Sequence, residues 1–303
     1  MKDRLDQYRG DLVALAYFDL LRKPLNIREL RRFGWQADWE IGDLRKVLKQ
    51  YRYEVDGVEL YGLSEIDSLQ VRGNQERVNE YWRWLKSKLW ILRLVPFVEL
   101  VMLMNGMAHG VVGSDSDIDL FVVTKPNRTW LVRGWMLMLL TIFRARANAN
   151  RKAMRLSPEF FVSTRQMNVS KVGSSSKFLT SFWVSDFTPV VYTENFNLFW
   201  KANYWLSNNL PVAYRSPKKG WVVNDKKPIV IKLIESILKG SLGDRIEKKA
   251  MNRQREIILK NLTKMGTNPD YVLQPELIKV HFNSQRPKQV DEAIRKFMSG
   301  DSK

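Results

Sequence analysis

The feature that most constrains the fold of this chain is a predominantly apolar run, residues 118–123, with one aspartate just before it and another at its second position. Asp117 and Asp119 are two residues apart. Alternate residues of a β-strand point to the same face, so we expect the two carboxylates side by side. Like charges this close in a half-buried setting repel each other and lose hydration, which a divalent cation with oxygen ligands relieves. An isolated Asp-x-Asp also fits a strand end whose aspartates face solvent.

A turn and a short helix are predicted directly before this strand. Residues 96–104 are mostly apolar and predict another strand, which Asn105 and Gly106 would end in a tight turn. Asn is the non-glycine residue that best tolerates a positive φ, so the turn survives with Asn105 at its first position. The residues from Met107 to Ser116 then separate the turn from the aspartates.

This order of elements resembles the signature of the DNA polymerase β-like nucleotidyltransferase superfamily, in which a Gly-Gly or Gly-Ser loop precedes Asp-x-Asp. Many bacterial members extend the loop as Gly-Ser-x-Ala-x-Gly. The present loop matches that form at Ala108 and Gly110, with Gly106 in the place of the serine. It departs from the form at Asn105, which replaces the first glycine and whose side chain would crowd the path of a phosphate.

The resemblance implies transfer of a nucleoside monophosphate from an NTP to an acceptor hydroxyl. Asp117 and Asp119 would hold two Mg²⁺ or Mn²⁺ ions, and backbone N–H groups of the loop would bind phosphate. The residues implied at the nucleotide are Asn105, Gly106, Met107, His109, Gly110 and Ser116. For His109, a phosphate contact and a bystander imidazole on the short helix both fit the sequence.

The superfamily usually adds a third carboxylate from a neighbouring strand. Glu159 is the only acid between Lys125 and Lys177, and it lies in residues 157–163, an aromatic and β-branched run that predicts a strand. Glu159 is therefore the candidate third metal ligand, which would also help to deprotonate the acceptor hydroxyl. It also fits a surface residue that balances basic neighbours. Asp186, which follows another aromatic run, is the second candidate.

The predicted fold class is α+β: a polymerase-β-like core, formed by a small mixed sheet with helices, between a winged helix and a helical C-terminal region. The expected domains are residues 1–70, 71–175 and 176–303. In the first, three helices precede a hairpin whose turn is Asp56-Gly57, and the spacing of Asn26 and Glu29 predicts a capping box at the start of the second helix. The third helix carries Arg45, Lys46 and Lys49, which suit duplex DNA or a solvated surface equally. A loop is expected at residues 173–176.

The net charge of +18 favours polyanionic partners. An RNA end, a small-molecule hydroxyl and a protein side chain all stay open as acceptors. With no cysteine and two histidines, disulfides are excluded and a His-built zinc site is not expected. No signal peptide or membrane partner is expected, and the predicted location is cytoplasmic. The alternative function is a catalytically weak or inactive protein of the same fold that binds nucleic acid.

Overall fold

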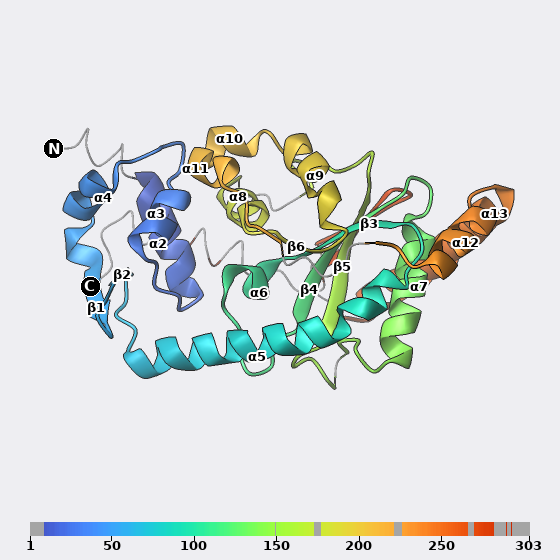
Figure 1. Cartoon of the computed structure of the whole chain (residues 1–303), viewed down its shortest axis with the longest axis horizontal. Coiled ribbons are helices and arrows are strands. Elements are labelled where there is room, and N and C mark those ends of the chain that lie inside the picture. The colour runs from blue at the N-terminus through green and yellow to red at the C-terminus, as the bar shows by residue number, and fades with distance from the viewer. Residues whose placement is uncertain are drawn as a thin grey trace.

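A six-stranded mixed sheet organises the molecule, with helices on both faces (Figure 1). The structure is a computed structural model that describes residues 9–148, 150–172, 177–220, 226–265 and 270–281, together with residues 289 and 292. The strand order is β6-β3-β4-β5-β8-β7. The protein therefore belongs to the mixed α+β class.

The middle of the sheet comes from three strands that are consecutive in the sequence. β3 (Val98–Leu103) and β4 (Ile118–Thr124) pair antiparallel, whereas β4 and β5 (Leu156–Ser163) pair parallel. Parallel strands need a crossover, and α7 (Thr129–Ile142) lies within this connection. The short helix α6 (Asn105–His109) joins β3 to β4, as predicted.

Both edges of the sheet come from the C-terminal region. β6 (Thr188–Val191) pairs antiparallel with β3. On the other side, β8 (Leu277–His281) pairs antiparallel with β5 and with the outermost strand, β7 (Asp270–Gln274). Residues 176–303 were predicted to be mainly helical, and the sequence analysis missed these three strands. The sheet therefore crosses the domain boundary predicted near residue 175.

The alternation of β4 supplies a core on each face of the sheet. Ile118, Leu120 and Val122 pack into one core with α5 (Ser68–Arg93), α7, α12 (Ile229–Leu238) and α13 (Ser241–Met265). Phe121 and Val123 pack into the other. The helices of this second layer are α8 (Lys177–Ser185), α9 (Phe196–Ala202), α10 (Leu206–Asn209) and α11 (Pro211–Arg215), with the 3₁₀ turn η2 (Thr193–Asn195) preceding α9.

The N-terminal helices also join the second core, and the long helix α5 runs from them along the sheet (Figure 1). They are α2 (Arg9–Leu20), α3 (Ile27–Arg32) and α4 (Ile41–Val47), followed by the 3₁₀ turn η1 (Lys49–Tyr51). The predicted capping box at Asn26 and the predicted hairpin of β1 (Arg52–Val55) and β2 (Val58–Tyr61) are both present. Both turn residues, Asp56 and Gly57, have positive φ, as such a tight hairpin requires.

Among the described residues, no helix combines the length and the apolar character needed to cross a bilayer. The loop predicted at residues 173–176 lies outside the described residues.

Candidate metal centre

Three carboxylates converge at the end of the sheet where β4 begins. Asp117 immediately precedes β4, Asp119 is its second residue, and Glu159 lies in β5. One oxygen from each lies within 4.8 Å of the others. All three residues are half-buried. The two aspartates are therefore side by side, as their spacing predicted, and Glu159 joins them from the neighbouring strand.

The pairing of β4 with β5 explains how Glu159 reaches this position. Leu120 pairs with Pro158, but Phe121 pairs with Phe160, so Glu159 is the extra residue of a β-bulge. A bulge redirects the side chain at the extra position. Phe160 continues into the core beneath α8 and stacks on Phe121 at a ring distance of 4.9 Å. The bulge thus allows Glu159 to join the two aspartates.

Burial and like charge both act on this cluster. Burial raises the pKa of Asp117, and the nearby charge of Glu159 raises it further. A hydrogen bond from Ser157 and the charge of Lys152 oppose the increase. The hydroxyl of Ser157 also lies 3.4 Å from Oε1 of Glu159. A divalent cation would relieve this repulsion and would receive oxygen ligands of the type that Mg²⁺ and Mn²⁺ prefer.

Asn105 links the loop to the carboxylates. Its φ is 55°, so the turn has the conformation that Asn was predicted to tolerate. Its Nδ2 donates to Oδ2 of Asp119 at 2.9 Å. Asn105, at the first position of the loop, therefore contacts one of the two aspartates of the cluster.

The two glycines of the loop have different roles. A Cβ on Gly106 would lie 2.7 Å from the carbonyl oxygen of Val111, because the chain turns back over this residue. The Val111 N–H donates to the Gly106 carbonyl at 2.8 Å. Gly110 ends α6 in the left-handed conformation, with φ 71°. A side chain at position 106 would therefore collide with the backbone of Val111, which requires glycine here whether or not a phosphate approaches the loop.

Side chains from three separate segments hold the last carbonyls of α6. Lys218 donates to Ala108 O, Lys23 donates to His109 O at 2.9 Å, and Asn74 donates to Gly110 O at 2.9 Å. The same residues line a cavity of about 530 Å³ between α5, α6 and the N-terminal helices. The sequence analysis did not identify this support, because its members are far apart along the chain.

His109 is buried between α2 and the end of α8. Its Nδ1 lies 2.8 Å from Oδ2 of Asp186, and its Nε2 lies 2.9 Å from the hydroxyl of Tyr17 in α2. Only 1% of the residue is exposed. Both ring nitrogens therefore bond to groups outside the cluster of Asp117, Asp119 and Glu159. A contact of His109 with phosphate stays a prediction.

Asp186, the second candidate for the third carboxylate, belongs to this buried network. Its Oδ1 lies 3.2 Å from Nζ of Lys218 and 3.6 Å from Nε of Arg32. Burial alone would raise the pKa of Asp186, but Lys218, His109 and Arg32 together hold it well below its usual range. Asp186 is therefore a structural anion, and the structure places Glu159 rather than Asp186 beside the aspartates.

The remaining predicted nucleotide residues are positioned by the loop. The side chain of Met107 is buried in the core that contains α5 and α7. The Ser116 hydroxyl accepts a hydrogen bond from the Gly113 N–H at 2.9 Å and so closes the turn before Asp117. The Tyr81 hydroxyl donates to the Ser116 carbonyl at 2.9 Å. Nucleotide contacts of these residues remain predictions.

Comparisons with known proteins give no relative from which a function could be transferred. No protein-family model matches the chain, no curated protein matches it, and no solved structure matches it.

Proposed function

We propose that the protein is a metal-dependent nucleotidyltransferase that moves a nucleoside monophosphate from an NTP to an acceptor hydroxyl. The observation that carries the proposal is the convergence of Asp117, Asp119 and Glu159, with one oxygen from each within 4.8 Å of the others. Three half-buried carboxylates from adjacent strands form an oxygen-rich donor set for hard divalent ions.

We further propose that the core is polymerase-β-like and that the N-terminal helices and hairpin form a winged helix. The order β3, α6, β4 with the aspartates at the start of β4 supports the first assignment. The three helices followed by the β1–β2 hairpin support the second.

In this mechanism Asp117 and Asp119 would hold two Mg²⁺ or Mn²⁺ ions, and Glu159 would contribute an oxygen to one of them. The chemistry that such ions would supply is stabilisation of charge as the acceptor oxygen bonds to the α-phosphate and pyrophosphate leaves. Glu159, which reaches the cluster from β5, would accept the proton of the acceptor hydroxyl. The first turn of α6 follows β3 beside Asp119. Its backbone N–H groups lack helical partners and can donate to phosphate.

The net charge of +18 favours an RNA 3′ end as the acceptor, because lysine and arginine side chains bind the phosphate backbone. Small-molecule and protein hydroxyls remain the other candidates. Duplex recognition by α4 receives less support. Arg45 pairs with Glu59 at 3.0 Å, and Lys46 pairs with Asp43 at 3.4 Å, so these cations already have acidic partners.

One contact favours a second candidate function, a protein of the same fold that binds nucleic acid with weak or no catalysis. The amide of Asn105 donates to Oδ2 of Asp119, an oxygen that a metal ion would use. If this hydrogen bond persists in the presence of metal, the site would hold its ions weakly.

Label transfer tests the proposal. The purified protein is incubated with each α-labelled NTP, Mg²⁺ or Mn²⁺, and total RNA, metabolites or protein as acceptors, which are then separated by size. We expect metal-dependent transfer that falls at least about 100-fold in Asp117→Asn and in Asp119→Asn, since metal ions contribute several kcal/mol to such steps. Asp115→Asn is the matched control, because Asp115 is an exposed residue of the same turn, outside the cluster.

Transfer that survives both substitutions would disprove the metal mechanism. Tight binding of duplex DNA at physiological salt, without binding or turnover of any NTP, would establish the second candidate function.

A further inference from the structure

The α12–α13 hairpin, at the opposite end of the molecule from the N-terminal helices (Figure 1), exposes an unusual amount of aliphatic surface. Ile229 is 85% exposed and Leu233 is 61% exposed. Val230 and Ile237 lie on the same side of α12, because these four positions follow the helical repeat. Leu242 and Ile246 at the start of α13 are also exposed. We call these six residues the aliphatic face.

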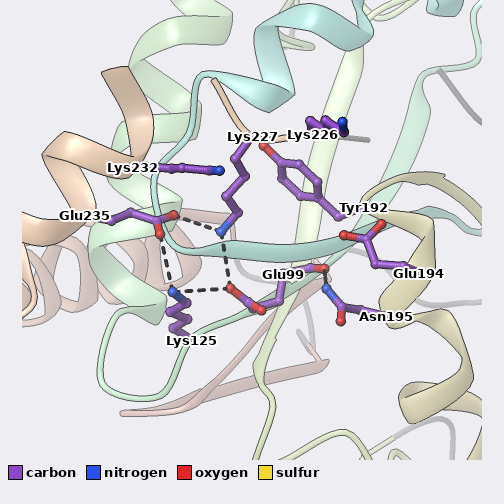
Figure 2. A pocket seen from close by; sticks show the side chains of 9 residues that line it. All are labelled: Glu99, Lys125, Tyr192, Glu194, Asn195, Lys226, Lys227, Lys232 and Glu235. Atoms are coloured by element: carbon purple, nitrogen blue, oxygen red, sulfur yellow. Dashed lines mark hydrogen bonds and ion pairs between the residues drawn. The ribbon is translucent and has the colours of Figure 1, made fainter. Parts of the chain in front are cut away.

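Contacts on the opposite side of α12 fix which way the aliphatic face points. Glu235 accepts the backbone N–H of Phe97 at 2.6 Å and pairs with Lys227 at 2.8 Å and Lys125 at 3.3 Å. Both lysines also pair with Glu99 (Figure 2). Burial alone would raise the pKa of Glu235, but these partners lower it. The helix is therefore tied to the start of β3 by a charged network that leaves its other side in solvent.

A second set of contacts fixes the turn between the two helices. Arg128 is buried and donates to the carbonyls of Leu238, Lys239 and Gly240 at the end of α12. Glu247 accepts two backbone N–H groups at the start of α7, those of Trp130 and Leu131. The hairpin cannot rotate to bury the aliphatic face without breaking these bonds.

The acidic side chains near the aliphatic face are all paired, whereas basic side chains are exposed around it. Residues 226–250 contain three acids, Glu235, Asp244 and Glu247, and each is engaged by the contacts above or, for Asp244, by Arg128 at 2.7 Å. The basic residues of the same segment are Lys226, Lys227, Lys232, Lys239, Arg245, Lys248 and Lys249. Lys226 and Lys232 are exposed but line a cavity of about 710 Å³ together with Glu235, on the tethered side of α12 (Figure 2). The exposed Lys249 follows Leu242 and Ile246 in the helical repeat of α13 and so borders the aliphatic face.

We propose that the aliphatic face of α12 and α13 docks on an anionic lipid surface, with the helices lying in the membrane interface. A lipid surface has an apolar acyl region and anionic headgroups. The aliphatic side chains would enter the boundary of the acyl region, and the neighbouring lysines would meet the headgroups. A polyanion such as RNA would use the cations but would leave the aliphatic side chains in water, because bases stack on aromatic rings. This proposal departs from the expectation of no membrane partner, which rested on the lack of a spanning segment, because a helix that lies in the interface needs none.

Vesicle co-sedimentation of the full chain tests this inference. We expect binding to vesicles of phosphatidylcholine and phosphatidylglycerol, little binding to phosphatidylcholine alone, and weaker binding at high salt. Leu233→Asn and Ile237→Asn should each weaken binding at least about tenfold, since each removes an aliphatic side chain that the membrane interface would bury. Leu69→Asn is the matched control, because Leu69 is 79% exposed on α5, outside the aliphatic face. Far-UV circular dichroism checks that each variant is folded.

Other occupants of the face give other results, and each would overturn the inference. Concentration-dependent dimerisation that Leu233→Asn abolishes, without vesicle binding, would assign the face to a second copy. Binding of RNA but not vesicles, unaffected by Leu233→Asn, would leave only a basic surface. Absence of both vesicle binding and self-association would also contradict the inference. Asp117→Asn should bind vesicles normally, so this test is independent of the proposed catalysis.

Discussion

His109 joins two segments that are far apart in the sequence, through Tyr17 in α2 and Asp186 after α8. Burial lowers the pKa of His109 below its ordinary value of 6.5, although Asp186 opposes this. Lys218 and Arg32 already balance the charge of Asp186, so the imidazole is neutral. Its Nδ1 then donates to Asp186, and its Nε2 accepts from the hydroxyl of Tyr17. The unfolded chain binds a proton at this histidine below pH 6.5 that the folded protein does not bind. Stability therefore decreases as pH falls below 6.5.

His109→Asn tests this protonation state. We expect the variant to be less stable than the natural chain at pH 7.5, by about 1–3 kcal/mol, because Tyr17 loses its partner. Its stability should nevertheless change less between pH 7.5 and pH 5, where the natural chain loses at most about 1.4 kcal/mol per pH unit through this residue. The low pKa of Asp186 matters only below this window, since carboxylates in unfolded chains titrate near 3.8. Urea unfolding at each pH is the measurement, and equal slopes for the two proteins would contradict a neutral His109.

Asn105 offers a second test at the residue scale. Asn105→Gly keeps a residue that accepts φ 55° and removes the hydrogen bond to Oδ2 of Asp119. We expect the variant to bind Mn²⁺ more tightly, because the carboxylate no longer shares its charge with the amide. Asn105→Val should instead destabilise the fold by about 1–2 kcal/mol, since a β-branched residue is strained at positive φ. Titration calorimetry with Mn²⁺ measures the first effect, and weaker binding by Asn105→Gly would instead show that the Asn105 side chain supports the metal site.

At the scale of elements, the five-residue helix α6 is held by side chains from elsewhere in the chain. Asn74 on α5 contributes two of its bonds, donating to Gly110 O at 2.9 Å and accepting from Val112 N at 3.1 Å. We expect Asn74→Ala to lower stability by about 1–3 kcal/mol and to speed amide hydrogen exchange in residues 105–116, because two backbone groups lose their partner. Asn79→Ala is the control on the same helix, where the side chain is exposed. Exchange that is equally fast in both variants would show that Asn74 does not hold the loop.

The sequence predicted those elements whose signals are local. Asn26 with Glu29, and Asp56 with Gly57, carry their structures within a few residues, and both were confirmed. The spacing of Asp117 and Asp119 likewise predicted their shared face. Glu159 was a candidate because its segment contains no other acid, but the bulge that turns it toward the aspartates depends on pairing with β4.

The parts that the sequence did not predict depend on distant pairing. β6 has only four residues, and its place beside β3 is set by pairing with residues 101–103, which lie far earlier in the chain. The β7–β8 hairpin has a short apolar run on each side of Pro275 and Glu276, a signal that closer reading could have found. The contacts of His109 and Asn74 had no such signal, because hydrogen-bond partners 35 or more residues away leave no periodic pattern.

For the whole molecule, the order of the sheet implies that the predicted catalytic region cannot fold by itself. A fragment of residues 71–175 retains β3, β4 and β5 but loses β6 and β8, which cover both sides of that trio. It also loses α13, whose Ile258 and Leu262 complete one core. We expect this fragment to lack cooperative unfolding and dispersed amide NMR signals, because it exposes two strand edges, loses part of one core and loses most of the other. A well-dispersed spectrum would show that the predicted boundary is a true domain boundary.

The alternation of β4 also protects the chain against one kind of folding error. A shift of one residue in the pairing of a strand exchanges its two faces. In β4 such a shift would place Asp119 among the apolar side chains that Ile118 and Leu120 now contact, where a charged carboxylate is strongly disfavoured. The aspartate that we propose as a metal ligand therefore also makes the misaligned sheet unstable. Loss of Asp119 would remove a safeguard on strand alignment as well as a carboxylate of the candidate site.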